Sequence, residues 1–503
     1  MTRPGLNIIL IVLDTLGAKH MSLYGYHRRT TPNLERLAGE ATVFSRCFAT
    51  GCWTIPSHGS LFTGLYPSEH GAYEGRYLLH DNIHHLVPSL KMMGYRTLGI
   101  SSNNLVAPAS GLCPGFDYFK DYGAGFLKLF QGGGFAPLSP EDDLSAILAA
   151  ADNPRGKWRL LARYLRATGN WDKVCKRLFE KVKNRSREKL DNFFGLSPIA
   201  HSAKYSEKTE KLFKQIIQEH DHHSSQPFFL FINFLEAHHY YRPPLRFRQF
   251  SQRHDRQTQN ICDFYGHDNS PASKDVINTY KNLYDDEIYY LDDIIGRLYH
   301  VLKKSSIFDH TALIITSDHG EHFGEKGYYG HMLSLHNELI WIPLVIRFPR
   351  TLAPPQIDDR LVSLSDVFST VLDLGHSPLP RPESSQSVLS SGKRELAVAQ
   401  IVYPEIWAGA GKIMGAAYAP PEFAVMTGRG KKIIKSRGGG LQVYDLHEDP
   451  DEKHDLFPGL PGAAAGDYRA LVGLLQEATH YGEAVQGARR RQELQQMRAC
   501  PVF

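Results

Sequence analysis

The stretch Asn7-Ile8-Ile9-Leu10-Ile11-Val12-Leu13 is an apolar, β-branched run that ends directly on Asp14. A run of this length without polar interruption predicts a strand buried on both faces, as in a parallel sheet. It is too short for a signal segment or a membrane span. The carboxylate at its end must be paired, cap a helix or bind a metal ion, because an isolated carboxylate is not tolerated in apolar surroundings.

The same kind of apolar segment recurs along the chain and alternates with helical patterns. Residues 31–38 form one such pattern, with Pro32 well placed in a first helical turn, and residues 276–302 form another. Further strands are expected at residues 97–101, 227–234 and 311–316. This alternation predicts an α/β fold in which a large, mostly parallel sheet is sandwiched by helices.

Polar groups suited to chemistry follow three of these predicted strands, namely Asp14, His238 and Asp318. In open α/β sheets, ligands bind beyond the carboxyl ends of the strands, where all three residues are expected. Asp318 lies in Thr316-Ser317-Asp318-His319-Gly320-Glu321, and a carboxylate beside an imidazole is a good pair of ligands for a divalent metal. Taken alone, such a pair in a loop is more often an ordinary cap or surface pair than a metal site.

Thr54 lies at the start of a predicted helix in Trp53-Thr54-Ile55-Pro56-Ser57-His58. The unpaired N–H groups and the positive dipole end of a helix favour an oxyanion, so a phosphate or sulfate would be held here. A threonine hydroxyl is a weak nucleophile, but a divalent cation stabilises its alkoxide. We therefore group Asp14, Thr54, Asp318 and His319 into one predicted metal site, with a plain helix cap as the alternative for Thr54.

The domain organisation is predicted from the segments where the alternation of apolar strands and helical patterns breaks down. Residues 1–375 are expected to form the catalytic α/β domain, with residues 106–225 as an inserted helical cap. Within the cap, residues 155–189 hold thirteen Lys or Arg against three Asp or Glu. This basic face is either simply solvated or attracts anionic partners. We expect residues 376–503 to form a small antiparallel C-terminal subdomain followed by a tail.

Composition limits the choice of partners and compartment. A formal charge of +4 over 503 residues gives no general attraction to nucleic acid, so no nucleic-acid partner is expected. The six cysteines show no paired spacing, which favours a reducing compartment. No stretch approaches the roughly 20 apolar residues of a membrane-spanning helix. We expect a cytoplasmic protein without a transmembrane segment, and its oligomeric state is left open.

Several short motifs, taken in chain order, resemble those of the sulfatase-like branch of the alkaline-phosphatase superfamily. They are the opening strand with Asp14, Thr31-Pro32-Asn33-Leu34-Glu35-Arg36-Leu37-Ala38, Pro56-Ser57-His58 to Thr63-Gly64, Phe234-Leu235-Glu236-Ala237-His238, Ser317-Asp318-His319-Gly320-Glu321 to Gly330-His331, Pro343-Leu344-Val345-Ile346 and Tyr444-Asp445-Leu446. The resemblance implies an alkaline-phosphatase-like fold for nearly everything outside the cap. It also implies that Asp14, Thr54, Asp318 and His319 bind a metal ion and that Thr54 attacks phosphorus or sulfur.

The resemblance implies roles for further residues. His238 and His331 would face the substrate, where they bind nonbridging oxygens, protonate the leaving oxygen or hold a second ion. A purely structural role is the alternative for each. Asn103, which follows the strand at residues 97–101, and Lys431 are further candidates for contacts with the anionic group.

The chain departs from formylglycine-dependent sulfatases in the motif around Thr54 and in the residue after Asp14. Those enzymes mature a cysteine in a Cys-x-Pro-Ser-Arg context, whereas Thr54 stands at the cysteine's place, and formylglycine cannot form from threonine. Thr15 replaces the second acidic residue expected after Asp14, which removes a carboxylate ligand. The pattern is therefore closer to phosphodiesterases, phosphonate ester hydrolases and phosphoethanolamine transferases. His319 suits manganese or zinc better than calcium, which is the alternative ion.

Together these features predict a metal-dependent hydrolase that cleaves phosphate mono- or diesters, or sulfate esters, through a covalent Thr54 intermediate. The substrate would be a small-molecule or lipid-like anionic ester, and one or two divalent ions would be bound. Two alternatives stay open. One is a phosphotransferase of the phosphoethanolamine-transferase type, and the other is a non-catalytic sulfatase-like binding protein.

Overall fold

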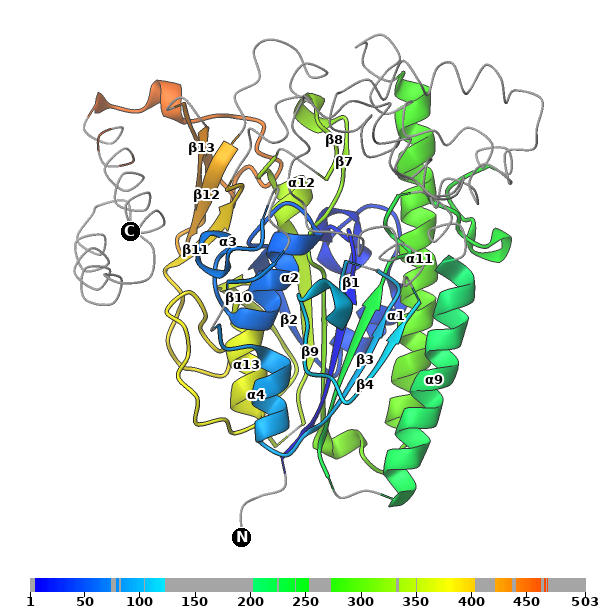
Figure 1. The fold of residues 1–503 in the computed structure, drawn as a ribbon. Helices are drawn as coiled ribbons and strands as arrows, with labels where there is room; N and C mark the ends of the chain where they lie inside the picture. The colour runs from blue at the N-terminus through cyan, green and yellow to red at the C-terminus, as the bar shows by residue number, and fades with distance from the viewer. Residues whose placement is uncertain are drawn as a thin grey trace, which may run out of the picture. The chain divides into compact units, whose positions relative to one another are not determined.

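Strand β1 (Asn7–Leu13) lies inside an eight-stranded sheet, and all of its residues are buried. It pairs in parallel with β5 (Phe228–Phe234) on one side and with β6 (Thr311–Thr316) on the other. The strand order is β10-β2-β9-β6-β1-β5-β3-β4 (Figure 1). Only β9 (Trp341–Arg347) runs antiparallel to its neighbours β2 and β6. The remaining strands of this sheet are β2 (Thr42–Phe48), β3 (Arg96–Ser101), β4 (Tyr118–Asp121) and β10 (Gln356–Ser363). The predicted large, mostly parallel sheet is confirmed.

The computed structural model describes residues 5–122, 202–252 and 273–462, together with residues 466 and 468. Within these ranges, residues 74–77, 81–82, 104, 224–225, 240, 332–333, 350, 403–420 and 437–439 are not described. The described residues all belong to one unit, formed by Met1–Tyr122 and Ser202–Phe503. Within the described part of the chain, no helix combines the length and apolarity needed to cross a membrane.

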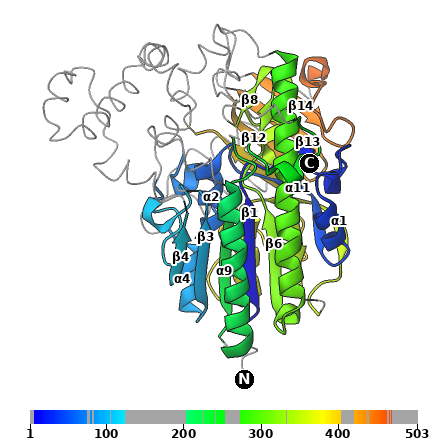
Figure 2. The ribbon, with the colours of Figure 1, turned by 90° about the vertical axis from the view of Figure 1, so that its right-hand side faces the viewer.

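Side chains of β1 alternate between the two faces of the sheet, as a strand requires. Ile8, Leu10 and Val12 belong to a core on one face, where the helices are α2 (Thr54–Thr63), α4 (Leu86–Met92) and α13 (Asp366–Leu374). The alternate residues of β1 belong to a core on the other face, where the helices are α1 (Pro32–Ala38), α9 (Ser202–His223) and α11 (Lys274–Lys303). Figures 1 and 2 show these two helical layers on opposite sides of the sheet. The chain is therefore a three-layer α/β structure, as predicted.

A second, smaller sheet forms in the C-terminal part of the chain. Its order is β11-β12-β13-β14, and all of its pairs are antiparallel. The strands are β11 (Leu396–Gln400), β12 (Pro421–Thr427), β13 (Lys431–Ser436) and β14 (Leu441–Asp445). The small antiparallel sheet expected in this part of the chain is therefore present.

The predicted cap overlaps only in part with the described residues. At its two ends, β4 forms the edge of the main sheet and α9 packs along α11. Residues 123–201, which include the basic patterns, lie outside the described residues, and so does the tail from residue 469. The cap and the limits of the domains stay predictions.

Asp292 of α11 anchors the first turn of α1. Its carboxylate accepts hydrogen bonds from the backbone N–H of Asn33 (2.7 Å), the side-chain amide of Asn33 (2.7 Å) and the backbone N–H of Leu34 (2.8 Å). These N–H groups stand at a helix start, where no intrahelical partner exists. Burial raises the pKa of Asp292 to about 6, although the bonds from Asn33 and Leu34 oppose that shift.

Replacing Asp292 by alanine is expected to destabilise the fold by about 2 kcal/mol, because buried N–H groups would lose their acceptor. Asp293, the next residue of α11, provides the matched control, since it is 35% exposed and pairs with Arg297 on the same helix. Asp293→Ala should change stability by no more than about 0.5 kcal/mol. Thermal unfolding of both variants measures the difference, and equal midpoints would contradict the anchoring role.

Candidate active site at the strand ends

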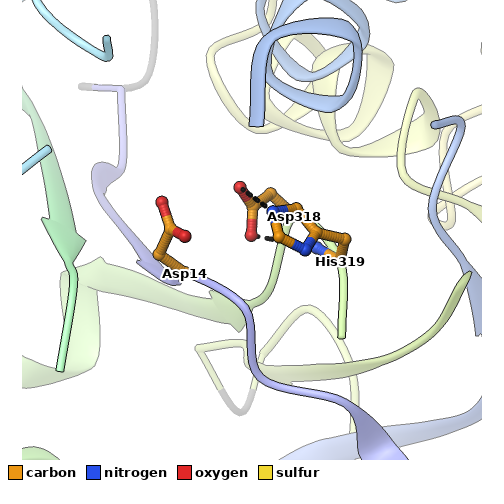
Figure 3. Close-up of side chains that lie close together, drawn as sticks. All are labelled: Asp14, Asp318 and His319. Carbon is orange, nitrogen blue, oxygen red and sulfur yellow. Dashed lines mark hydrogen bonds and ion pairs between the residues drawn. The ribbon is translucent and has the colours of Figure 1, made fainter. Parts of the chain in front are cut away.

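The register of β1 with β6 places two candidate ligands side by side. Val12 pairs with Thr316, so Asp14 and Asp318 each lie two residues beyond the same rung of the ladder. Both strands are parallel, and their carboxyl ends therefore meet at one edge of the sheet. Oxygen atoms of Asp14 and Asp318 and a nitrogen of His319 lie within 4.8 Å of one another, and all three residues are buried. Figure 3 shows the three side chains close together beyond the ends of the two strands.

Two potential ligand atoms in this cluster, Nε2 of His319 and Oδ2 of Asp318, lie 3.4 Å apart. His319 donates its Nδ1 proton to the carbonyl oxygen of Gly320 (3.0 Å), which leaves the lone pair on Nε2 in the neutral ring. Among the described residues, neither this Nε2 nor Oδ2 of Asp318 has a hydrogen-bond partner, although both are buried. Buried polar atoms are almost always satisfied, so this pair is the kind of donor set that a divalent cation completes.

Two histidines lie beside the Asp318 carboxylate. Burial raises the pKa of Asp318, but His319 and His58 outweigh that effect and hold it well below its usual value. The reciprocal effect acts on His58, where burial lowers the pKa and the neighbouring Asp318 carboxylate raises it above the ordinary value. Asp318 is therefore ionised in the folded chain and available as an anionic ligand.

Thr15 connects the two ligand loops. Its backbone N–H donates to Oδ1 of Asp318 (3.0 Å), and its hydroxyl donates to Oδ1 of Asp14 (2.8 Å). Its carbonyl oxygen accepts from the hydroxyl of Tyr284 (2.7 Å). Thr15 has φ of 63°, which is a strained conformation for a β-branched residue. Three hydrogen bonds therefore hold a backbone geometry that costs about 1 to 3 kcal/mol.

Helix α2 begins close to Asp318. Trp53 occupies the N-cap position and Thr54 is the first helical residue, so the interpretation of Thr54 as the cap is wrong. His58 lies one turn later and donates from Nδ1 to the carbonyl oxygen of Thr54 (3.0 Å), while the same nitrogen lies 3.4 Å from Oδ2 of Asp318. His58 therefore links the first turn of α2 to the ligand cluster. The role of Thr54 as nucleophile and ligand stays a prediction.

Two histidines extend the site away from the ligand loops. His331 follows β8 (Tyr329–Gly330), and its ring centroid lies 4.8 Å from that of His319 and 4.9 Å from that of His238. His331 also contacts Glu321 through Nδ1 and Oε1 (3.0 Å). The predicted residues His238 and His331 are thus brought together beside His319.

The pKa values of these two histidines diverge. Burial and the charge of His331 lower the pKa of His238. Burial also lowers the pKa of His331, but the charge and hydrogen bond of Glu321 outweigh burial and raise it. His238 donates its Nδ1 proton to the carbonyl oxygen of His239 (2.7 Å). The arrangement thus pairs a neutral histidine with one that retains its proton, which is a pattern suited to acid–base work.

The two remaining candidates lie in different places. Asn103 follows β3, and its side-chain amide donates to Oδ2 of Asp14 (2.7 Å), so it belongs to the cluster. Lys431 pairs with Asp445 (2.5 Å) on the neighbouring strand of the small sheet. Among the described contacts, none joins Lys431 to the ligand cluster. Its contact with substrate stays a prediction.

Sequence reasoning gave no site role to His58 and Glu321. Both were visible inside quoted motifs, but nothing in their spacing shows that His58 reaches Asp318 or that Glu321 holds His331. The sequence showed Thr15 only as a replacement for an expected acidic residue. Its bridging role requires a positive φ, which a threonine does not signal.

A mostly parallel sheet between helical layers, with an acidic and imidazole cluster at the strand ends, defines an α/β protein with a candidate metal site at the carboxyl edge of the sheet. Residues 6–377 match the model of the sulfatase family, and the chain belongs to that family. Mouse steryl-sulfatase is 27% identical over 431 residues, a match that covers 74% of this chain but only 62% of the mouse protein. The N-acetylgalactosamine-6-O-sulfatase of Bacteroides thetaiotaomicron is 24% identical over 505 residues. This match covers 90% of this chain and 89% of the bacterial protein.

A solved structure supports the same fold. The phosphonate monoester hydrolase from Silicibacter pomeroyi superposes with a TM-score of 0.62 at 15% sequence identity, covering 94% of this chain and 95% of its own. At this identity the likeness concerns the fold. The predicted fold and the predicted resemblance to the sulfatase-like branch are confirmed.

Gly320 allows close contact between the Asp318 loop and the segment around Glu338. A Cβ atom on Gly320 would lie 2.1 Å from the carbonyl oxygen of Glu338, which is backbone and cannot swing away. Gly320→Ala is therefore expected to destabilise the fold by about 1 to 3 kcal/mol. Gly459→Ala is the control, because a Cβ atom there meets nothing within 4 Å. Thermal unfolding measures both, and a Gly320→Ala variant as stable as the wild type would contradict this packing.

Proposed function

We propose that this chain is a metal-dependent hydrolase of phosphate or sulfate esters that works through a covalent Thr54 intermediate. The observation that carries the proposal is the pair of buried ligand atoms on Asp318 and His319 that have no hydrogen-bond partner among the described residues, next to Asp14 and close to the start of α2. Membership of the sulfatase family supports ester hydrolysis, and the relatives named as sulfatases support sulfate esters as one substrate class. Threonine in place of the matured cysteine supports a phosphorus ester as the other.

The residues present fit a divalent cation. Asp14 and Asp318 would supply carboxylate oxygens, His319 would supply Nε2, and Thr54 would supply its hydroxyl. A ligand set that mixes oxygen with imidazole favours manganese or zinc over calcium, whose ligands are oxygen. Such an ion would lower the pKa of the Thr54 hydroxyl and offset negative charge on the ester.

The chain's own residues would carry out the bond changes. Thr54 Oγ forms a bond to phosphorus or sulfur while the bond to the leaving alcohol oxygen breaks. Thr54 releases its hydroxyl proton to solvent, and the leaving oxygen gains a proton from His331, whose pKa is raised by Glu321. In the second step a water oxygen bonds to phosphorus or sulfur and the bond to Thr54 Oγ breaks. One proton of that water passes to Thr54 Oγ, and His331 regains a proton from solvent. One water is consumed, and an alcohol and a free oxyanion are released.

Activity should depend on both the metal and the Thr54 hydroxyl. The test offers nitrophenyl phosphate, phosphodiester, phosphonate and sulfate to metal-stripped chain resupplied with manganese, zinc or calcium. Thr54→Ala should abolish turnover while the chain still binds the ion, whereas Thr54→Ser should retain part of the activity because it keeps a hydroxyl. Equal turnover by Thr54→Ala and the wild type would refute the covalent mechanism, and the preferred ester would identify the substrate class.

His331 should matter most when the alcohol is a poor leaving group. Its replacement by glutamine is expected to slow kcat/KM for an alkyl ester by about 100-fold or more, the usual range for loss of a general acid. The loss should be much smaller for a nitrophenyl ester, whose leaving group needs no proton. His238→Gln is the control, and its loss should be similar for both esters. A His331→Gln loss independent of the leaving group would argue against proton donation.

A further inference from the structure

We propose that a buried ion network in the C-terminal part of the chain, centred on Lys432 and Glu452, positions the two loops that carry the ligand cluster. The network acts through the short helix α12 (Asn337–Ile340), which packs against both loops. Lys432 and Glu452 are therefore positioning residues, and neither is placed to touch substrate. Only the metal-affinity part of the test below rests on the proposed function.

Helix α12 contacts both ligand loops directly. The carbonyl oxygen of Glu338 would lie 2.1 Å from a Cβ atom on Gly320, so only glycine permits the approach there. The same oxygen would lie 3.2 Å from a Cβ atom on Gly17, which makes that contact tight. The backbone N–H of Gly320 also donates to the carbonyl oxygen of Leu339 (2.7 Å). Gly17 lies three residues after Asp14, and Gly320 lies two residues after Asp318. A shift of α12 would therefore move both loops.

Residues from the C-terminal part hold the start of α12. Glu452 accepts a hydrogen bond at Oε2 from the backbone N–H of Asn337 (2.8 Å) and lies 3.2 Å from Nδ1 of His336. Lys432 of β13 donates to Oδ1 of Asn337 (2.9 Å) and pairs with Glu452 (2.5 Å). The Asn337 side chain in turn donates to the carbonyl oxygen of Pro450 (3.0 Å). These bonds connect α12 to two separate C-terminal segments.

A second set of ion pairs ties the same helix to the Asp14 loop. Glu338 accepts from Lys19 (2.8 Å), which lies five residues after Asp14 and also pairs with Asp451 (2.8 Å). Lys326 lies 3.5 Å from Glu338 and donates to the carbonyl oxygen of Asp451 (3.0 Å). Glu338, Lys19 and Asp451 therefore form a continuous path from the C-terminal segment to a ligand loop.

The network contains a buried ion pair and a residue with a strained backbone. Lys432 is fully buried and Glu452 is 2% exposed. Burial raises the pKa of Glu452, but Lys432 and His336 outweigh burial and lower it to about 2, so the carboxylate stays ionised. Glu452 also has φ of 54°, which is uncommon for a residue other than glycine. Removing Lys432 or Glu452 would leave the other charge buried without compensation, and this would loosen the start of α12.

The test compares Glu452→Gln with Asp366→Asn in the full-length chain. Asp366 is also buried, and it pairs with Arg394 of the C-terminal part, but its described contacts do not include α12. Both variants disturb a buried ion pair, so general destabilisation is matched. Hydrogen exchange of the backbone amides of residues 14–17 and 318–320 is the first measurement. We expect faster exchange there in Glu452→Gln than in Asp366→Asn, and similar exchange in the two would overturn the proposal.

Metal affinity is the second measurement, with manganese or zinc titrated into each variant by calorimetry. Loss of a residue that orients metal ligands typically weakens binding by about 10-fold or more, and we expect this for Glu452→Gln but not for Asp366→Asn. If the wild-type chain binds no metal, the proposed function fails, whereas the exchange comparison still decides the positioning role. Should Glu452→Gln not fold, Asn337→Ala removes the bonds to Lys432 and Pro450 more gently and is held to the same two outcomes.

Discussion

The parallel pairing of β1 with β6 is the constraint on which the site depends. The register sets Asp14 and Asp318 on neighbouring strand ends, and it brings two buried carboxylates together. Two unit charges within 4.8 Å repel by about 3 kcal/mol or more at an effective dielectric constant of 20. Histidine and amide groups placed around the two carboxylates offset this repulsion. His58 and His319 face Asp318, and Asn103 donates to Asp14.

The same constraint explains the strained backbone at Thr15. Each carboxylate needs a donor on the side that faces the other loop, and the left-handed turn at Thr15 supplies one donor to each. Glycine would adopt this turn without strain but could not supply the hydroxyl. A carboxylate at this position would add a third negative charge to the cluster. Threonine therefore lowers the negative charge of the site while it still connects the loops, which agrees with a ligand set of mixed oxygen and nitrogen.

Much of this arrangement could be predicted from sequence, because it depends on local patterns. The apolar runs of β1, β5 and β6 predict adjacent buried strands, and polar residues after such strands must share one edge of the sheet. The antiparallel direction of β9 was not predicted, since an apolar run carries no sign of its direction. The contacts of His58 and Glu321 were missed for a related reason, because each depends on a neighbour that is distant in sequence or reached by a particular turn.

The lysines of β13 show where local reasoning ends. Lys431 and Lys432 are adjacent and chemically identical, and the sequence favoured Lys431 as a contact for an anion. Successive residues of a strand point to opposite faces, so one lysine pairs with Asp445 at the partly exposed surface and the other enters the interior beside Glu452. Which of the two is buried depends on the register of β13 with its neighbours and on the Glu452 turn, not on the composition of the segment. Because the buried lysine contacts Asn337 of α12, the register of a small sheet distant in sequence determines how firmly the loops of Asp14 and Asp318 are held.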